Sequence, residues 1–320
     1  MRNRLNLRKT RAVMVSHANI WTLLLILLVF YLINPNFLNP FNMKNLLTNM
    51  APLLVMACGA TYVRLLGSLD LSMGAVASCA NVMLVKLLPV LGAASFAVVL
   101  AFGLFAGFLL GLIHTKLKIP SFIASLGMMN VYNSVALLIT AKPENIAKAE
   151  KIYISWARTS WGVISVSTII AVSIMLILHF AQIRTPVGRS LNLIGANERT
   201  TRISGIHVDR TKIFAFTICG LTCSISGCLL AVKLQSSAPT VGNSFTLLAV
   251  AAVLLGGTSM TGGKGSVLKT LLGVLMVTMI ENGMTIIGVD AFWSQIVFGA
   301  LIIVAMFLTS DRQERNLVVK

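Results

Sequence analysis

Charge is scarce in this sequence, and acidic residues are the scarcest of all. Only 11% of the 320 residues are charged, and nine Asp and Glu stand against 26 Lys and Arg, which gives a net charge of +17. Soluble globular chains are about 25% charged. With 57% hydrophobic residues and a mean hydropathy of +0.88, the composition leaves little room for a soluble domain. It predicts a single transmembrane domain over residues 1–320.

The basic excess has a different meaning here from the one it has in a soluble protein. In a soluble chain it would indicate nucleic-acid binding. Here the Lys and Arg residues gather between apolar runs, so we interpret them as topology signals and contacts with anionic membrane lipid. No nucleic-acid partner is expected.

The sequence also shows no arrangement of residues typical of a catalytic or metal site. No nucleophile stands in an arrangement with a base, and the four histidines are scattered. The five cysteines lie within apolar stretches without metal-ligand spacing, so we expect small hydrophobic residues at helix interfaces. We predict no catalytic residues, no bound cofactor and no metal.

Residues 254–266, LLGGTSMTGGKGS, resemble the phosphate-binding loop G-x-x-x-x-G-K-[ST] but lack two of its parts. Thr258 replaces the first glycine, and Gly265 follows Lys264 where a hydroxyl would bind Mg²⁺. The glycine permits the turn that aims N–H groups at phosphate, so its loss matters. We therefore predict a tight turn between helices. Its turn glycines are Gly256, Gly257, Gly262, Gly263 and Gly265.

Apolar stretches and the breakers between them predict an all-α polytopic membrane protein with about ten transmembrane helices, some of them broken. Small residues recur at intervals of four within residues 102–114, which lets helices approach closely in lipid. The predicted spans are 14–33, 46–66, 70–88, 94–113, 121–140, 161–181, 212–233, 245–261, 266–287 and 291–309.

The ends and loops predict an orientation. The basic N-terminus, residues 1–13, precedes an apolar run without a small-residue cleavage site, so we expect an uncleaved first helix. With the N-terminus and the 310–320 tail in the cytoplasm, most of the basic residues fall on the cytoplasmic side, as the positive-inside rule requires. Two connections are long: an external loop at 141–160 with room for a short helix, and a cytoplasmic loop at 182–211.

An acidic residue at membrane depth is the first candidate for a functional site. Asp70 lies in LLGSLDLSMGA, residues 65–75, with Ser72 and Gly74 close behind. Intramembrane carboxylates are costly and mark functional sites by default, and the glycines indicate a broken helix. Its role is open between a helix cap that pairs with Arg64, contact with a solute, and gating or subunit contact.

A second polar pair, Glu281 and Asn282, lies inside an apolar span before Gly283. A buried acid beside an amide needs hydrogen-bond partners. The pair either lines a pathway or joins helices.

The long cytoplasmic loop contains a segment with helical character. Asn197 can cap a helix there, Gly205 can end it, and Glu198 can pair with Arg202 at i, i+4. The segment is either a solvated loop or a docking element for a partner, and a short amphipathic helix favours docking. The candidate docking residues are Gly188, Arg189, Gly195, Asn197, Glu198, Arg199, Arg202 and Gly205.

Four stretches carry a family resemblance: GSLDLSMGA (67–75), KIPSFIASLGMM (118–129), TPVGRSLNLIGANERTTRISGI (185–206) and AAVLLGGTSMTGGKGSVLKTLLG (251–273). In this order and spacing they resemble the permease subunit of ribose-type bacterial ATP-binding cassette (ABC) sugar importers, and the resemblance runs from about Phe37 to Leu308. It is specific for the family and says little about the solute.

The resemblance implies a permease of the bacterial inner membrane that forms a dimer with a second copy or a paralogue. A cytoplasmic ATPase would bind ATP and Mg²⁺ and couple through residues 188–206, while a periplasmic binding protein would deliver a monosaccharide. The chain would be a transport subunit and not an enzyme. Two alternatives stay open: an ABC permease for a nucleoside, a furanose signalling molecule or a branched-chain amino acid, and a secondary transporter that works alone.

Overall fold

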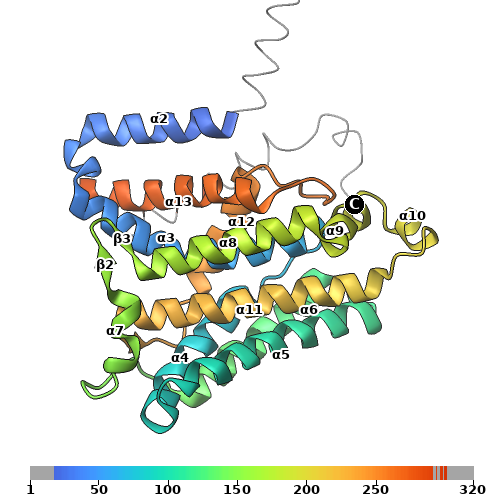
Figure 1. Ribbon diagram of the computed structural model, residues 1–320, viewed down its shortest axis with the longest axis horizontal. Helices are drawn as coiled ribbons and strands as arrows, with labels where there is room; N and C mark the ends of the chain where they lie inside the picture. Colours follow the sequence, from blue (N-terminus) through green and yellow to red (C-terminus); the bar gives the residue numbers. More distant parts are fainter. Residues whose placement is uncertain (1–17, 291–292, 294–295, 298, 301–320) are drawn as a thin grey trace, which may run out of the picture.

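Long helices running side by side make up most of the computed structural model, which describes residues 18–290, 293, 296–297 and 299–300 (Figure 1). The helices are α2 (Ala18–Ile33), η1 (Pro35–Leu38), α3 (Pro40–Leu65), α4 (Met73–Leu91), α5 (Ala94–Lys116), α6 (Ser121–Ile139), α7 (Ile152–Arg158), α8 (Val166–Arg184), α9 (Pro186–Ala196), α10 (Glu198–Ile203), α11 (Val208–Leu234), α12 (Asn243–Leu255) and α13 (Val267–Ile287). Two antiparallel pairs of short strands join β1 (Glu144–Asn145) to β4 (Ser236–Ser237) and β2 (Ser160–Trp161) to β3 (Ile164–Ser165).

The predicted all-α membrane class is confirmed. In the described part of the chain, seven helices are long and apolar enough to cross a membrane, namely α3, α4, α5, α6, α8, α11 and α13. The apolar helices α2 and α12 are shorter. Most of the predicted span 291–309 lies outside the described residues. Both chain ends lie wholly outside them. The total of about ten spans and the cytoplasmic termini therefore stay predictions.

Two predicted boundaries shift for local reasons. Helix α8 begins at Val166 rather than at 161, because residues 160–165 form the β2–β3 hairpin and the Ser165 hydroxyl then accepts from Thr168 N at the helix start. Helix α12 ends at Leu255, because Gly257 adopts a φ of +88° that ordinary residues avoid. The expected short helix of the 141–160 loop is α7.

The core is built around α3. Every residue from 50 to 66 is buried, and nearly all of them are apolar, which fits a helix enclosed by others. Helices α8, α11, α12 and α13 surround it. All five cysteines are buried and free, as the sequence predicted: Cys58, Cys79, Cys219, Cys223 and Cys228.

The small residues of 102–114 form a close helix contact. Gly103, Gly107 and Gly111 line one side of α5, and a Cβ added to any of them would collide with α11. At Gly107 the collision is with the carbonyl oxygen of Phe216. The predicted close approach of helices is therefore present between α5 and α11.

Candidate functional site

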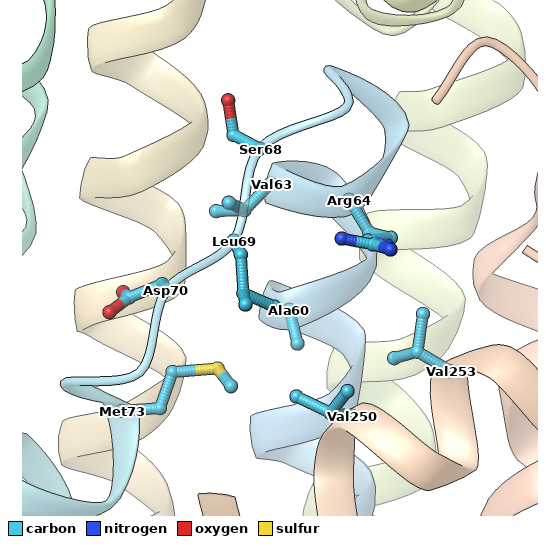
Figure 2. A pocket seen from close by; sticks show the side chains of 9 residues that line it. All are labelled: Ala60, Val63, Arg64, Ser68, Leu69, Asp70, Met73, Val250 and Val253. Carbon is cyan, nitrogen blue, oxygen red and sulfur yellow. The ribbon is translucent and has the colours of Figure 1, made fainter. Parts of the chain in front are cut away.

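The chain is not helical between α3 and α4, and this break holds Asp70. Gly67 turns it with a φ of +75°. The Asp70 carboxylate is 4% exposed and accepts from Ser72 N at 2.8 Å and from Ser72 Oγ at 2.6 Å. Figure 2 shows the carboxylate directed away from Arg64, and no ion pair joins the two among the described residues. The pairing that the sequence allowed is not formed, and the carboxylate instead supports the turn that leads into α4.

Two neighbouring helices hold the break in place. Leu69 N donates to Ser121 Oγ at the start of α6, over 3.1 Å. Gly74 N donates to Thr246 Oγ1 of α12 at 3.0 Å, and a Cβ on Gly74 would collide with Gly242 O. A shift of α6 or α12 therefore moves the Asp70 segment.

The glycine-rich turn between α12 and α13 packs against the same break. Gly262 and Gly263 have φ values of +89° and +74°, and Gly263 N donates to the carbonyl oxygen of Leu65 at 2.8 Å. A Cβ on Gly195, at the end of α9, would collide with both Leu65 O and Gly263 N. We call this meeting of the α9 end, the glycine-rich turn and the α3 end the backbone junction. The stretch is a turn, as predicted.

Sequence reasoning missed a side chain that supports this turn. Gln182, near the end of α8, is 4% exposed and donates from Nε2 to Gly265 O at 3.0 Å. Its Oε1 accepts from Val267 N at 2.9 Å. The only sign of this role in the sequence is that Gln182 is a single amide in the last turn of an apolar span. The other turn glycine, Gly256, packs closely against Lys269 O, 2.7 Å from where its Cβ would lie.

The predicted docking loop folds into α9 and α10. Asn197 caps α10 by accepting from Thr200 N at 3.0 Å. Glu198 accepts from Arg202 at 3.4 Å, as predicted, and from Lys212 at 2.7 Å. Arg202 also reaches Asp209 at 3.0 Å. Burial raises the pKa of Glu198, but the hydrogen bonds and charges of Lys212 and Arg202 outweigh it, so the net pKa lies below the ordinary value.

This loop presents a mixed surface to its surroundings. The side chains of Arg189, Arg199 and Ile203 are exposed, and Ile203 is 80% exposed although it is apolar. Gly188 packs against the Gln182 backbone, whereas Gly205 has a φ of +81° and no neighbour within 4 Å of its added Cβ. The loop is therefore fixed at its α9 side and open at its α10 side.

Glu281 and Asn282 belong to a different region. Asn282 exchanges hydrogen bonds of 2.9 Å with Asn42 at the start of α3. Asp70 follows the other end of that helix, roughly 35 Å away at 1.5 Å per residue. Asn282 therefore joins α13 to α3, whereas Glu281 is exposed rather than buried as the sequence suggested. Neither residue lies near Asp70.

Comparisons with known proteins point to a family of membrane permeases. Residues 42–306 match the family described as branched-chain amino acid transport system, permease component. The chain is 35% identical over 300 residues to the ribose import permease protein RbsC of Bacillus subtilis, which covers 91% of each chain. It is 31% identical over 313 residues to RbsC of Escherichia coli, covering 95% of this chain and 96% of the relative. It is also 28% identical to the L-arabinose transport system permease protein AraH of Escherichia coli, covering 89% and 87%. No solved structure matches significantly.

The family match, the permease relatives and the seven apolar helices make this a multi-pass protein of the bacterial inner membrane. The matched residues include the break at Asp70, the backbone junction and the α9–α10 loop. The chain belongs to the permease-component family of branched-chain amino acid transport systems.

Proposed function

We propose that this chain is the membrane subunit of an ABC importer that takes a monosaccharide from a periplasmic binding protein. The likeness to ribose and arabinose permeases over most of the chain carries the proposal. ATP and Mg²⁺ would bind to the ATPase, and the permease would supply the pathway.

The backbone junction supports a coupling mechanism. An ATPase that docks on α9 and α10 moves α9, whose end lies against the glycine-rich turn and Leu65. Because Leu65 immediately precedes the break, the movement reaches the Asp70 segment and, through the Leu69–Ser121 hydrogen bond, α6. Closure of the ATPase dimer would thus switch the bundle between its two orientations.

Helix α6 supports a pathway shared with a second permease. Only 22% of the residues in its most apolar stretch are buried against the rest of the chain. Gly127, Asn130 and Ser134 are exposed on it at helical spacing. Polar side chains on a membrane helix face protein or water rather than lipid, so this stripe is expected to face the pathway of a homodimer or a heterodimer.

Uptake into proteoliposomes tests the proposal. The permease, the ATPase and the binding protein encoded beside it are reconstituted together and offered ribose, arabinose, a nucleoside and leucine. We expect ATP-dependent uptake of a monosaccharide that requires the binding protein. Uptake of the nucleoside or leucine alone would identify a permease for that solute. Uptake by the permease alone, driven by an ion gradient, would identify a secondary transporter and contradict the proposal.

A further inference from the structure

Arg64 is a buried cation that has no counter-ion in the part of the chain that the structure describes. It lies in the last turn of α3 and is only 8% exposed. None of the ion pairs among the described residues includes it, and its Nε has no hydrogen-bond partner. A helix C-terminus favours a cation, but this effect is much smaller than the cost of an unpaired charge held away from water. The arrangement calls for an anion in some state of the protein.

The Arg64 side chain lines a small cavity between the α3–α4 break and α12 (Figure 2). The cavity measures about 10 Å³, the room of one water molecule. Besides Arg64, its polar lining residues are Ser68 and Asp70, and the rest are apolar, among them Val250 and Val253 of α12. In this conformation the cavity accepts one small group and not a whole sugar.

The acidic residues in the described part of the chain do not supply the anion. The Asp70 carboxylate is held by Ser72 and points away from Arg64 (Figure 2). The guanidinium is buried, so only a group small enough to enter the cavity reaches it. A molecule that enters the pathway is one source of such a group.

We propose that Arg64 forms a carboxylate subsite in the pathway, and that the transported solute is an acidic monosaccharide such as an aldonate or a uronate. This inference rests on the proposed function. The planar guanidinium binds a carboxylate with two parallel hydrogen bonds. Ser68 lines the same cavity, and the valines of α12 offer an apolar wall for the carbon face of the sugar.

The chemistry of the cavity favours a carboxylate over a phosphate ester. A phosphate ester carries up to two negative charges, and Arg64 is the only cation among the residues that line the cavity. The cavity must widen to admit the sugar, and the break that forms one wall contacts the backbone junction through Gly67, whose added Cβ would lie 2.6 Å from Thr261 O. Movement of α9 is therefore a means of opening the subsite.

Ligand-dependent thermal stabilisation of the permease–ATPase complex tests the subsite without the binding protein. The complex in lipid nanodiscs is heated with D-gluconate, D-glucuronate, D-ribose or acetate, both without nucleotide and with a non-hydrolysable ATP analogue. In at least one of the two states, we expect gluconate or glucuronate to raise the melting temperature, with an apparent Kd at least tenfold tighter than that of ribose.

Variants assign this stabilisation to Arg64. Arg64→Met is expected to remove it, and Arg64→Lys, which keeps the charge but loses the planar fork, to weaken it severalfold. Arg184→Met is the matched control, because Arg184 is an exposed arginine in the last turn of α8, and it should bind sugar acids like wild type. If Arg64→Met does not fold, unchanged affinity in Arg64→Lys still overturns the proposal.

Three other results overturn the proposal. One is that no sugar acid stabilises the complex in either nucleotide state, and another is that acetate stabilises it as much as the sugar acids do, which would indicate a small-anion site only. The third is that Arg64→Met binds gluconate as tightly as wild type. Reconstituted uptake of neutral monosaccharides separates this failure from that of the proposed function. If neutral monosaccharides are taken up but sugar acids do not bind, the proposed importer function stands and the proposed carboxylate subsite is wrong.

Discussion

The Glu198 carboxylate shows how a single residue can make the α9–α10 loop sensitive to pH. It accepts from Lys212 at 2.7 Å and from Arg202 at 3.4 Å. Its pKa in the folded protein lies below the ordinary value of 4.5. A group with a lowered folded pKa stabilises the fold fully above its unfolded pKa, and this stabilisation is lost as the pH falls through the folded pKa.

We therefore expect Glu198→Gln to lower the melting temperature slightly at neutral pH, with the difference from wild type shrinking below about pH 4.5. The effect should be at most about 1 kcal/mol, because the Glu198 and Arg202 side chains are largely open to solvent. Thermal unfolding of both proteins between about pH 7 and pH 3.5 measures it. A difference that stays constant over this range would show that the carboxylate charge is not its cause.

Side-chain contacts differ in whether the sequence alone predicts them. Asn197 as a cap and the Glu198–Arg202 pair were predictable, because both interactions are local in the chain. The partners of Gln182 and of Asn282 were not, because they lie 83 to 240 residues away and depend on how the helices pack. The isolation of Arg64 likewise follows from Asp70 binding Ser72, which the residue order alone does not decide.

At the scale of helices, two glycines with opposite surroundings test the packing of α5 on α11. A Cβ on Gly107 would collide with the backbone of α11, whereas Gly127 on α6 has nothing within 4 Å. Gly107→Ala should lower the melting temperature by several degrees, since overpacking costs about 1–3 kcal/mol. Gly127→Ala should be neutral or slightly stabilising, because Ala favours a helix by about 0.5–1 kcal/mol over Gly. Equal melting temperatures for the two variants would contradict the close contact.

The coupling function of the backbone junction is tested at Gly195. A methyl group there would collide with Leu65 O and Gly263 N, so Gly195→Ala should push α9 off the junction. ATPase binding through α10 should persist, while uptake stimulated by the binding protein should fall at least about tenfold, which corresponds to roughly 1.4 kcal/mol. Co-purification measures the first and proteoliposome uptake the second.

Gly205→Ala provides the comparison for this experiment. It meets backbone strain at a φ of +81° but no neighbouring atom within 4 Å, so uptake should fall less than in Gly195→Ala. Normal uptake in Gly195→Ala would show that the junction does not carry the coupling. Loss of ATPase binding would instead show that α9 itself forms the docking surface.

For the whole molecule, the surrounding membrane explains both the successes and the gaps of the sequence prediction. The helical spans were predictable because lipid requires each helix to satisfy its own backbone groups. The lengths of the helices were less predictable, since α2 and α12 are shorter than a typical span. The short helix η1 and the two strand pairs were not predicted, because they come from local turns and tertiary contacts. Orientation depends on the distribution of charge and needs a measurement of its own.

Cysteine labelling supplies that measurement, because all five native cysteines are buried and a wild-type background should react little. Lys148 in the 141–160 loop and Thr200 in α10 are both exposed. With the N-terminus inside, Lys148→Cys should react with a membrane-impermeant maleimide in intact spheroplasts, and Thr200→Cys only after the membrane is opened. The reverse pattern would invert the positive-inside assignment and place α9 and α10 where no cytoplasmic ATPase reaches them. Reaction of both residues in intact spheroplasts would instead place them on the same side of the membrane, with an even number of spans between them.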